Sequence, residues 1–344
     1  MKAAVLEKIN APLAVGDVEP LELQSGQVLV RNIVSGICGS QLQEIAGNKG
    51  NAKFVPHLLG HEGCGKVEEI GPDVTRLKKG DKVVLHWRKG DGIESPFPTY
   101  LYKGKKMPSG KVTTFSEYSI VSENRASVVS EDIPNDFCAL LGCSLSTALS
   151  TVEKEARVQK GERVLVVGLG GLGASFLKAA HLADAGSLVA VDVADKSAAA
   201  ERLGATLFIN IARQRLIEAL GAGNVQDFDV IIETSGKPDS IEMTLPLLAP
   251  SGRYIMVGQP KPGEDILIKN AYHLFGGEGK MIKATQGGQF SPELDIPRYV
   301  ELYRNGKLNI NDLVSHRTTL EGINDAIMRM REGGASRVLI DIWQ

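Results

Sequence analysis

Apolar and polar positions follow two different patterns along this chain. From residue 1 to about residue 144, short apolar runs are separated by turns that contain glycine or proline, and this pattern predicts a β-rich domain. The turns come too often for a βαβ array, so the pattern favours a compact β-barrel. The expected strands are Ala3–Leu6, Gln27–Ile33, Cys64–Ile70, Lys82–Leu85 and Ser116–Val121.

From about residue 145 to residue 284, apolar runs of strand length alternate with segments of helical spacing. This alternation is typical of a parallel sheet with helices on its faces. The expected strands are Val164–Val167, Leu188–Val191, Val230–Glu233 and Gly252–Val257, and the expected helices are Gly173–Ala183, Ser197–Leu203, Ile211–Leu220 and Ser240–Leu248. Beyond residue 285 we expect two amphipathic helices and a closing strand, at Asp295–Asn305, Leu320–Glu332 and Arg337–Ile342.

The strand at Val164–Val167 ends in a cluster of glycines that opens a helix. A turn without side chains at a helix N-terminus presents free backbone N–H groups to an anion. Gly168 permits the turn, and Gly173 lets the helix pack closely on the strand. Gly170 and Gly171 let a pyrophosphate approach the backbone. The sequence therefore predicts a dinucleotide site here rather than a turn without a ligand.

A carboxylate ends the next expected strand, about twenty residues further along the chain. Asp192 stands where a dinucleotide fold places the acid that accepts the ribose hydroxyls. Its charge would repel the 2′-phosphate of NADP, so NAD is the expected cofactor and NADP the less favoured one. Lys196 is close enough in the sequence to weaken this preference and joins the candidate cofactor residues.

Size and charge narrow the class of protein. A chain of 344 residues suggests two domains. The net charge of −2 with interspersed signs predicts no nucleic-acid partner and no anionic membrane surface. We find no apolar run of membrane-spanning length and no signal-peptide pattern at the N-terminus, so a soluble cytoplasmic protein is expected. The four cysteines show no disulfide spacing, which fits a reducing compartment.

Three residues of the first domain are of the types that bind zinc: Cys38, His61 and Cys143. Two thiolates and an imidazole suit this metal, and three protein ligands leave a fourth position for water or substrate. Each residue alone also has an ordinary explanation, because cysteine is often a small core residue and a lone histidine is often only hydrogen-bonded. Spacing alone leaves both interpretations open.

Three motifs carry a resemblance to a known family: Gly36-Ile-Cys-Gly-Ser40, Gly60-His-Glu-Gly-Cys-Gly65 and Gly142-Cys-Ser-Leu-Ser-Thr147. With the glycine turn and Asp192, they resemble zinc-dependent medium-chain alcohol dehydrogenases over essentially the whole chain. The resemblance implies a GroES-like β-barrel catalytic domain from residues 1–144 and 285–344. It also implies a Rossmann NAD-binding domain, a doubly wound parallel sheet, from residues 145–284, with the active site in the cleft between the two domains.

The resemblance also implies roles for single residues. Cys38, His61 and Cys143 resemble the ligands of one catalytic zinc ion. Glu62 resembles the carboxylate behind the metal that approaches it during ligand exchange. Ser40 resembles the hydroxyl that passes on the alcohol proton.

Three further residues match positions of the family pattern. Thr147 resembles a residue that packs beside the nicotinamide. Arg337 resembles the arginine that reaches the cofactor pyrophosphate, although without the match it would be taken for a surface residue on an edge strand. Trp87 falls where the family has an aromatic wall of the substrate pocket, although an aromatic residue is more often part of a core.

The chain departs from the family pattern in three places. The segment 86–112 has none of the four cysteines that hold a structural zinc in many relatives, so no structural zinc is expected. Its lysines and arginines either attract an anionic substrate or form an ordinary solvated loop. Gln43 replaces the histidine that ends the proton relay, and Gln41 replaces the aspartate that orients the histidine ligand, so the Gln41 amide oxygen must accept that hydrogen bond.

The expected activity is reversible hydride transfer between NAD and an alcohol or its aldehyde or ketone. Cys143, where polyol dehydrogenases tend to have glutamate, favours alcohols over polyol, sugar or phosphorylated-sugar substrates. A zinc-free NADPH quinone or enoyl reductase and a non-catalytic dinucleotide-binding protein are the remaining alternatives. The family resemblance implies a homodimer or homotetramer that pairs along a strand near Arg253–Val257.

Overall fold

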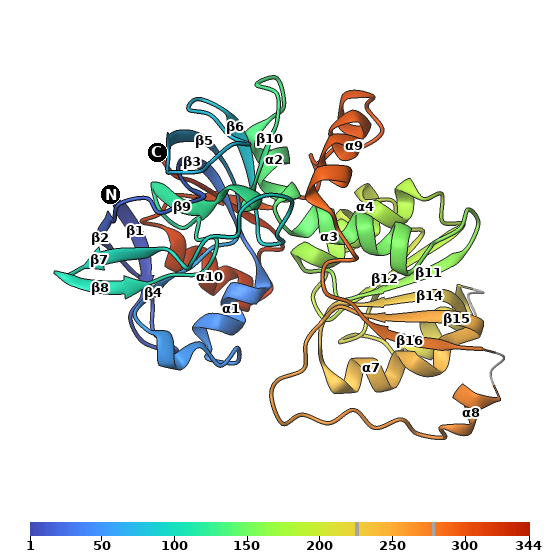
Figure 1. The fold of residues 1–344 in the computed structure, drawn as a ribbon. Helices are drawn as coiled ribbons and strands as arrows, with labels where there is room; N and C mark the ends of the chain where they lie inside the picture. Colours follow the sequence, from blue (N-terminus) through green and yellow to red (C-terminus); the bar gives the residue numbers. More distant parts are fainter. Residues whose placement is uncertain (224–226, 277–278) are drawn as a thin grey trace. The chain divides into compact units, whose positions relative to one another are not determined.

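The computed structural model describes residues 1–223, 227–276 and 279–344, and they form two compact units (Figure 1). The first unit comprises Met1–Ser146, Phe290–Ile310 and Val314–Gln344, and the second comprises Thr147–Gln289 and Asn311–Leu313. The division falls within helix α3 (Ser144–Ser150). Among the described residues, no helix is both long and apolar enough to cross a membrane.

The first unit is built on two mainly antiparallel sheets, as the turn-rich pattern predicts. One sheet has the order β4-β1-β2-β7-β8, and its strands are β4 (His57–Leu58), β1 (Lys2–Leu6), β2 (Ala14–Pro20), β7 (Thr99–Tyr102) and β8 (Lys105–Pro108). The predicted strand Ala3–Leu6 is present as β1. Four strands of this sheet were not predicted. Glycine, proline and charged residues interrupt the apolar pattern of β2 and β8, and β4 and β7 are only two and four residues long.

The second sheet of this unit contains the strands that lead into the candidate site. Its order is β10-β6-β5-β3-β18-β17, and β9 also pairs with β3. The bounds are β10 (Ala126–Val128), β6 (Lys82–His86), β5 (Glu62–Ile70), β3 (Gln27–Ile37), β18 (Val338–Asp341), β17 (His316–Thr318) and β9 (Tyr118–Ser122). The antiparallel register of β18 and β3 places Val338 opposite Ile37. The C-terminal strand therefore lies beside the residues that lead into Cys38.

Helices and short turns complete the first unit. They are α1 (Gly39–Ile45), η1 (Asn51–Phe54), η2 (Glu123–Arg125), α2 (Asn135–Leu141), α9 (Pro292–Arg304) and α10 (Ile323–Arg331). One face of α10 presents Ile323 and Ile327, which pack with Phe115 and Ile340 in one buried apolar cluster. The C-terminal segment thus contributes core residues to the N-terminal domain.

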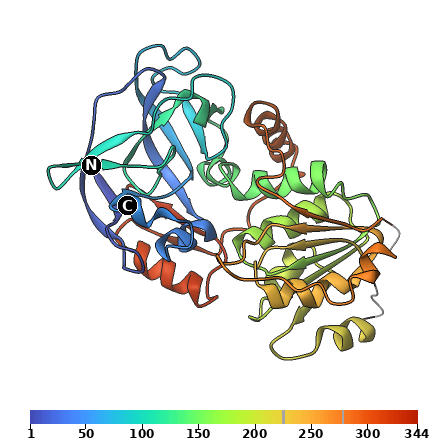
Figure 2. The same cartoon turned by 60° about the horizontal axis from the view of Figure 1, so that its bottom comes forward.

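The second unit contains a six-stranded sheet in which every pairing is parallel. Its order is β13-β12-β11-β14-β15-β16, so the chain starts in the middle and winds out both ways, as in a Rossmann domain (Figure 2). The strands are β13 (Leu207–Asn210), β12 (Ser187–Asp192), β11 (Arg163–Val167), β14 (Phe228–Glu233), β15 (Leu248–Met256) and β16 (Met281–Ala284). The predicted fold class is confirmed.

The helices of this unit follow the prediction less closely at their ends. They are η3, a π-helix (Thr151–Glu155), α4 (Gly171–Leu182), α5 (Ser197–Arg202), α6 (Leu216–Ala222), α7 (Pro238–Thr244), η4 (Leu245–Leu247) and α8 (Tyr272–Phe275). The expected helix at Ser240–Leu248 ends earlier, because Pro246 cannot continue an α-helix and Leu248 already begins β15. The expected helix at Ile211–Leu220 starts only at Leu216.

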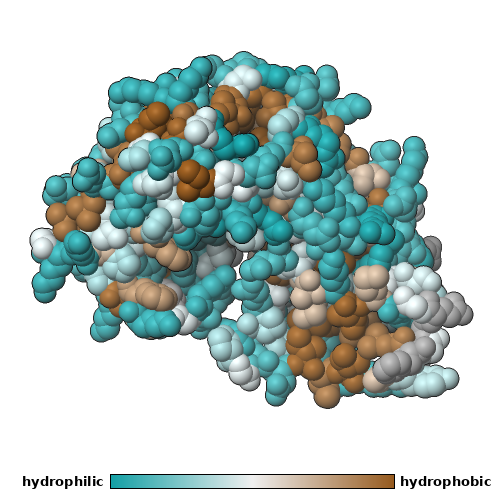
Figure 3. Space-filling view, in the orientation of Figure 1, coloured by the Kyte–Doolittle hydropathy of each residue, from teal (hydrophilic) through white to brown (hydrophobic). Residues whose placement is uncertain are grey.

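The edge of the parallel sheet corrects one expectation. Arg253–Val257 belongs largely to β15, which pairs with β14 on one side and β16 on the other. The edge strands of this sheet are β13 and β16, and on β16 Met281 and Ile282 are 48% and 39% exposed. Figure 3 shows apolar side chains gathered on the surface of this unit.

His86, the last residue of β6, is buried and hydrogen-bonded through both ring nitrogens. Nδ1 lies 2.6 Å from the Arg88 carbonyl oxygen, and Nε2 lies 2.9 Å from the Ser127 hydroxyl. Because a carbonyl only accepts, Nδ1 carries the proton and Nε2 accepts from Ser127. Burial lowers the pKa of His86 to about 4.

We expect the buried, neutral His86 to make the fold acid-sensitive. The unfolded chain binds a proton near pH 6.5 and the folded chain only near pH 4, so stability is full above pH 6.5 and falls between these values. The free energy of unfolding should fall by on the order of 3 kcal/mol less over this pH range in His86→Gln than in the parent protein. Urea unfolding of both proteins from pH 7.5 to 4.5 measures the difference. If the free energy of unfolding falls equally with pH in both proteins, the prediction is contradicted.

Candidate functional site

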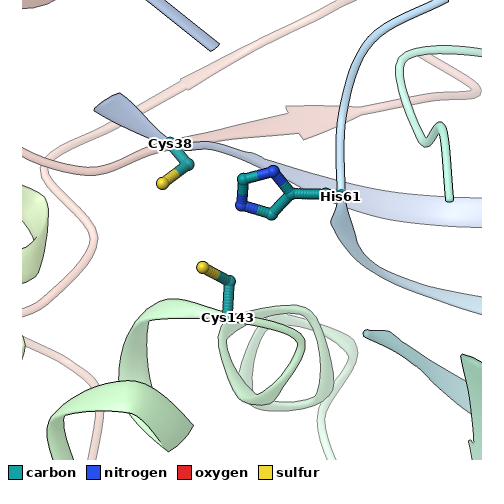
Figure 4. A group of neighbouring side chains, drawn as sticks. All are labelled: Cys38, His61 and Cys143. Carbon is teal, nitrogen blue, oxygen red and sulfur yellow. The ribbon is translucent and has the colours of Figure 1, made fainter. Parts of the chain in front are cut away.

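Three loops of the first unit bring Cys38, His61 and Cys143 together. Cys38 follows β3 and precedes α1, His61 directly precedes β5, and Cys143 lies between α2 and α3. Their ligand atoms all lie within 4.8 Å of one another. Figure 4 shows the two sulfur atoms and the imidazole ring turned toward one common space.

The unpartnered atoms of this cluster fit a zinc ion. His61 Nε2 is buried without a hydrogen-bond partner among the described residues, although a buried ring nitrogen normally has one. Zinc bonds of about 2.3 Å to sulfur and 2.0 Å to nitrogen would hold tetrahedral ligand atoms roughly 3.5–3.8 Å apart. A small contraction of the cluster therefore suffices to coordinate the metal.

Neighbouring groups favour a thiolate in the cluster. A hydrogen bond from the Cys143 thiol, with the nearby His61 and Arg337, lowers the pKa of Cys38 well below its ordinary value. The same hydrogen bond raises the pKa of Cys143. The hydrogen bond thus stabilises a thiolate on Cys38, and coordination of a metal ion through both sulfur atoms requires both thiols to lose their protons.

Directly behind the cluster, Glu62 and Arg337 form a buried ion pair. Arg337 Nη1 lies 2.5 Å from Glu62 Oε1 and donates a second hydrogen bond, of 3.2 Å, to the Ile37 carbonyl. Glu62 is fully buried, and its Oε2 accepts from the Ser144 backbone N–H at 3.1 Å. Burial raises the pKa of Glu62, whereas the charge of Arg337 lowers it. Arg337 is thus not a surface residue, and within the first unit its charge is directed at Glu62.

Two glycines of the predicted motifs make room for the Glu62 side chain. A Cβ at Gly36 would lie 2.6 Å from Glu62 Oε1, and a Cβ at Gly142 would lie 2.8 Å from the Glu62 Cα. A larger residue at position 36 would displace the carboxylate, and one at position 142 would displace the Cα and Cβ of Glu62 or the Leu85 carbonyl. These glycines therefore serve the site and not only the turns in which they occur.

The second nitrogen of His61 is held by α1. Gln41 Nε2 lies 2.6 Å and Ser40 Oγ 3.4 Å from His61 Nδ1. The sequence predicts the amide oxygen of Gln41 at this place, and the structure has the amide nitrogen there instead. Metal binding through Nε2 requires a proton on Nδ1, and turning the Gln41 amide by 180° supplies its Oε1 as acceptor; that oxygen is buried without a partner among the described residues.

Glu44 is a residue of this region that the sequence analysis missed. It lies one turn after Gln41 on α1, and its Oε2 is 3.5 Å from Gln41 Nε2. Its Oε1 is 3.9 Å from Nε2 of the buried His57, and burial raises the pKa of Glu44. A carboxylate is therefore present near the histidine ligand. It contacts Gln41 rather than His61 itself, whereas the expected pattern has a carboxylate in direct contact with the histidine. Helical spacing from Gln41 could have indicated it.

Two buried hydroxyls on the far side of the ligand loop were also missed. Ser35 Oγ and Thr114 Oγ1 lie 2.7 Å apart and reach the Glu62 carbonyl oxygen at 3.2 and 3.1 Å. Gly60, with φ +93°, packs against Thr114, where a Cβ would lie 2.5 Å from Oγ1. These contacts fix the backbone on both sides of His61, but nothing in the motif spacing predicts them.

Trp87 follows β6 directly and is partly buried. Its backbone N–H donates to the Gly142 carbonyl at 3.4 Å, next to the ligand Cys143. Its own carbonyl accepts from Arg125, and the Arg88 guanidinium lies 5.9 Å from its ring. The backbone of Trp87 is therefore held beside the cluster.

Two lysines of the segment 86–112, and Arg125 outside it, pair with glutamates. Lys103 pairs with Glu7 at 2.6 Å, and Lys111 and Arg125 lie 3.4 and 2.7 Å from Glu94. Such pairs leave less positive charge for an anionic ligand.

The glycine turn of the second unit has the geometry of an anion site. Gly168, with φ +85°, ends β11, and Gly170 and Gly171 begin the twelve-residue helix α4. A Cβ at Gly173 would collide with the Gly168 carbonyl oxygen, so only glycine allows this close packing. At Gly170 a Cβ would meet no atom within 4 Å, so the turn is open on that side.

Asp192 ends β12 and points back to this turn. Its Oδ2 accepts from the Leu169 backbone N–H at 2.6 Å, and its Oδ1 accepts from Ala194 at 2.8 Å. Lys196 Nζ lies 3.4 Å from Asp192 Oδ2 and donates to the Leu169 carbonyl at 2.9 Å. Asp192, Lys196 and the glycine turn are thus connected by hydrogen bonds through Leu169.

Thr147 lies on α3, one helical turn after Cys143, and is 7% exposed. By the division of the chain it begins the second unit.

Two family models match this chain. One, described as an alcohol dehydrogenase GroES-like domain, matches residues 24–135, and the other, described as a zinc-binding dehydrogenase, matches residues 171–305. Alcohol dehydrogenase 6 of Peromyscus maniculatus is 29% identical over 98% of this chain and 97% of its own.

Solved structures agree with these matches. An alcohol dehydrogenase zinc-binding domain protein from Burkholderia ambifaria superposes with a TM-score of 0.89 at 26% identity, over 100% of this chain and 99% of its own. Benzyl alcohol dehydrogenase from Acinetobacter calcoaceticus superposes with a TM-score of 0.88 at 26% identity, over 99% of each chain.

Breaking the buried ion pair should be strongly destabilising. Glu62→Gln leaves the Arg337 charge buried and uncompensated, and we expect the free energy of unfolding to fall by about 3–5 kcal/mol. The double variant Glu62→Gln/Arg337→Met should recover much of this loss. Asp132→Asn, which breaks the exposed pair with Arg304, is the control and should leave the free energy of unfolding nearly unchanged, because solvent screens this pair. Urea unfolding of metal-free protein measures all of them, and equal losses for the two single variants would contradict the prediction.

Proposed function

This chain belongs to the zinc-containing medium-chain dehydrogenase family, as an oxidoreductase acting on CH–OH groups, and we propose that it transfers a hydride reversibly between an alcohol and NAD. The observation that carries this proposal is the Cys38, His61 and Cys143 cluster, with its ligand atoms within 4.8 Å and one unpartnered ring nitrogen. A protein that only binds dinucleotides, or a zinc-free reductase, has no use for such a cluster.

We assign these three residues as the ligands of one catalytic zinc ion. When bound, the zinc ion supplies a Lewis acid that stabilises the alkoxide form of the alcohol or polarises the carbonyl. The bound NAD supplies the hydride acceptor. Once its amide is turned, Gln41 accepts from Nδ1 and holds the neutral His61 tautomer that ligation through Nε2 needs, and the thiolate of Cys38 is favoured by its neighbours.

The alcohol proton must leave the site, and Ser40 is the proposed carrier. Its hydroxyl lies 3.4 Å from His61 Nδ1, at the start of α1, where it can accept a proton and donate one onward. Gln43, bound to Asn48 Nδ2 at 2.7 Å, cannot titrate near neutral pH. The proton therefore passes from Ser40 to water or to a ribose hydroxyl.

Glu62 and Arg337 are proposed to control the charge behind the ligands. Glu62 carries the negative charge that compensates Arg337, and a shift of its carboxylate toward the cluster would assist ligand exchange. Arg337 Nε is buried without a partner among the described residues. This atom supports a further proposed contact of Arg337 with the cofactor pyrophosphate.

In the second unit, Gly168, Gly170, Gly171 and Gly173 are the proposed pyrophosphate turn. Asp192 is proposed to accept the ribose hydroxyls, which favours NAD, with Lys196 beside it as a cation that tolerates some NADP. Thr147 is proposed to pack beside the nicotinamide.

The proposed substrates are small alcohols and their carbonyl compounds, with Trp87 as an apolar wall. The glutamate partners of Lys103, Lys111 and Arg125 argue against a phosphorylated sugar. A polyol dehydrogenase is the second candidate within the family. It is less favoured, because the third proposed ligand is Cys143 and not a glutamate.

We further propose a homo-oligomer in a reducing, cytoplasmic setting. The open edge of β16 and its exposed Met281 and Ile282 support association. All four cysteines are free thiols, which supports the compartment.

Removing one ligand should remove both the metal and the turnover. We expect Cys38→Ser to lower bound zinc from about one per chain to a small fraction and NADH formation by about three orders of magnitude. Cys138→Ser is the matched control, because Cys138 is buried outside the cluster and should keep both. Metal analysis and absorbance of NADH measure the two effects. Full turnover of zinc-free Cys38→Ser would rule out the proposed chemistry.

The cofactor preference should depend on Asp192. We expect Asp192→Ser to lower the ratio of kcat/KM with NAD to kcat/KM with NADP by about 10- to 100-fold, because the repelling charge is lost and Lys196 is released. Asp195→Ser, which removes an exposed carboxylate paired with Arg213, is the control. Steady-state kinetics with both cofactors measure the ratio, and an unchanged ratio contradicts the role of Asp192.

A further inference from the structure

One short segment of the first unit makes several hydrogen bonds to the loop that follows β6. We call residues 87–98 the lobe and Ser122–Arg125 the clamp; the clamp comprises the end of β9 and η2. The segment 86–112 contains no cysteine, so neither a disulfide nor a thiolate-bound metal ion can hold the lobe. Protein groups alone must therefore order it.

Each residue of the clamp binds the lobe. Ser122 Oγ accepts from the Ser95 N–H at 3.0 Å. The Asn124 carbonyl accepts from the Gly90 N–H at 2.7 Å. Arg125 donates to Glu94 through Nη2 at 2.7 Å and Nε at 3.2 Å, and through Nη1 to the Trp87 carbonyl.

Glu123 provides the centre of the clamp. Its carboxylate is 2% exposed and accepts three backbone N–H groups, from Ile93 at 2.9 Å and from Thr75 and Arg76 at 3.0 and 3.2 Å. A Cβ at Gly92, with φ +114°, would lie 2.9 Å from Glu123 Oε1. A buried carboxylate with three charge-assisted hydrogen bonds is a rigid anchor.

Arg125 is the clamp residue that reaches the candidate site. Trp87 is fixed on its N–H side by the Gly142 carbonyl and on its carbonyl side by Arg125. Gly142 directly precedes the ligand Cys143, and His86 pairs with Glu62 across β5 and β6. Arg125 is 13% exposed and is itself locked by Glu94. On its carbonyl side, the position of Trp87 beside the metal ligands is therefore held by one guanidinium.

We propose that Arg125 is a positioning residue that determines substrate specificity by fixing Trp87 beside the metal ligands. The proposal rests on the proposed function, which places Trp87 in the substrate pocket. Arg125 itself touches no substrate and acts only through the Trp87 backbone. Its loss frees the indole without removing the zinc ligands, so the binding of bulky alcohols suffers more than the chemical step.

The first test follows the indole itself. The chain has two tryptophans, so Trp343→Phe leaves Trp87 as the sole indole fluorophore. In this background we expect Arg125→Met to shift the emission maximum to longer wavelength and to increase acrylamide quenching about twofold. Arg125→Lys, which can bind only one of the two acceptors, should lie between. Arg304→Met is the matched control, because Arg304 forms the same type of pair with Asp132 and does not bind the lobe.

The second test separates binding from chemistry in zinc-loaded enzyme. For Arg125→Met we expect KM for benzyl alcohol to rise about tenfold, with kcat and the KM for ethanol changed less than about twofold. Arg304→Met should leave all three constants unchanged. Equal effects on both alcohols would contradict the specificity role.

Circular dichroism and zinc content confirm that each variant is folded and loaded. An unchanged Trp87 emission in Arg125→Met overturns the proposal whether or not the parent oxidises alcohols. A parent without turnover, but with the expected change in emission, overturns the substrate role and the proposed function while leaving the Trp87 contact in place.

Discussion

The buried pair of Glu62 and Arg337 is the interaction on which the first unit depends. Two charges removed from water are stable only when each is compensated, and here Glu62 also binds the Ser144 N–H while Arg337 binds the Ile37 carbonyl. These contacts join β5, the start of α3, the end of β3 and the C-terminal segment. The three ligand loops leave from the same elements. The geometry of the cluster is thus set by a neutralised charge pair behind it.

The same constraint explains the small residues around the site. Gly36 and Gly142 leave the volume that the Glu62 side chain occupies, and Gly60 allows Thr114 to reach the ligand loop. In the second unit, Gly173 allows α4 to approach β11. Close approach of backbone, rather than flexibility, is what these glycines provide. Both candidate sites are therefore prepared before any ligand binds, which reduces the reorganisation that binding requires.

The sequence predicts those features that depend on local pattern or on a motif. The four central Rossmann strands, the glycine turn and Asp192 follow from apolar periodicity and spacing, whereas the edge strands β13 and β16 were not predicted. The ligand set follows from the resemblance that the motifs carry. The predicted end of the helix at Ser240–Leu248 was wrong, because Pro246 ends the helix and Leu248 begins β15 although the apolar pattern continues. The strands β7 and β8 were missed because their residues alternate weakly.

Long-range partners were beyond the sequence analysis. Arg337 was matched to a phosphate, but its strand register brings it to Glu62, and no local pattern encodes that pairing. Thr114 was missed for the same reason, since it acts through a neighbour from another element. Glu44 lies on the same helix as Gln41, so its helical spacing from Gln41 was a local signal that was not used. Gln41 was identified correctly as the neighbour of His61, but its amide orientation depends on which nitrogen carries the proton.

The pairing of β18 with β3 has a consequence for the order of folding. The second unit is nearly continuous in sequence, so its contacts can form soon after its own segment is made. The first unit brings together residues about three hundred positions apart, such as Ile37 and Val338, with the second unit inserted between them. Closing so long a loop is slow, so the ligand loops acquire their full support only late, after the inserted unit has formed its sheet.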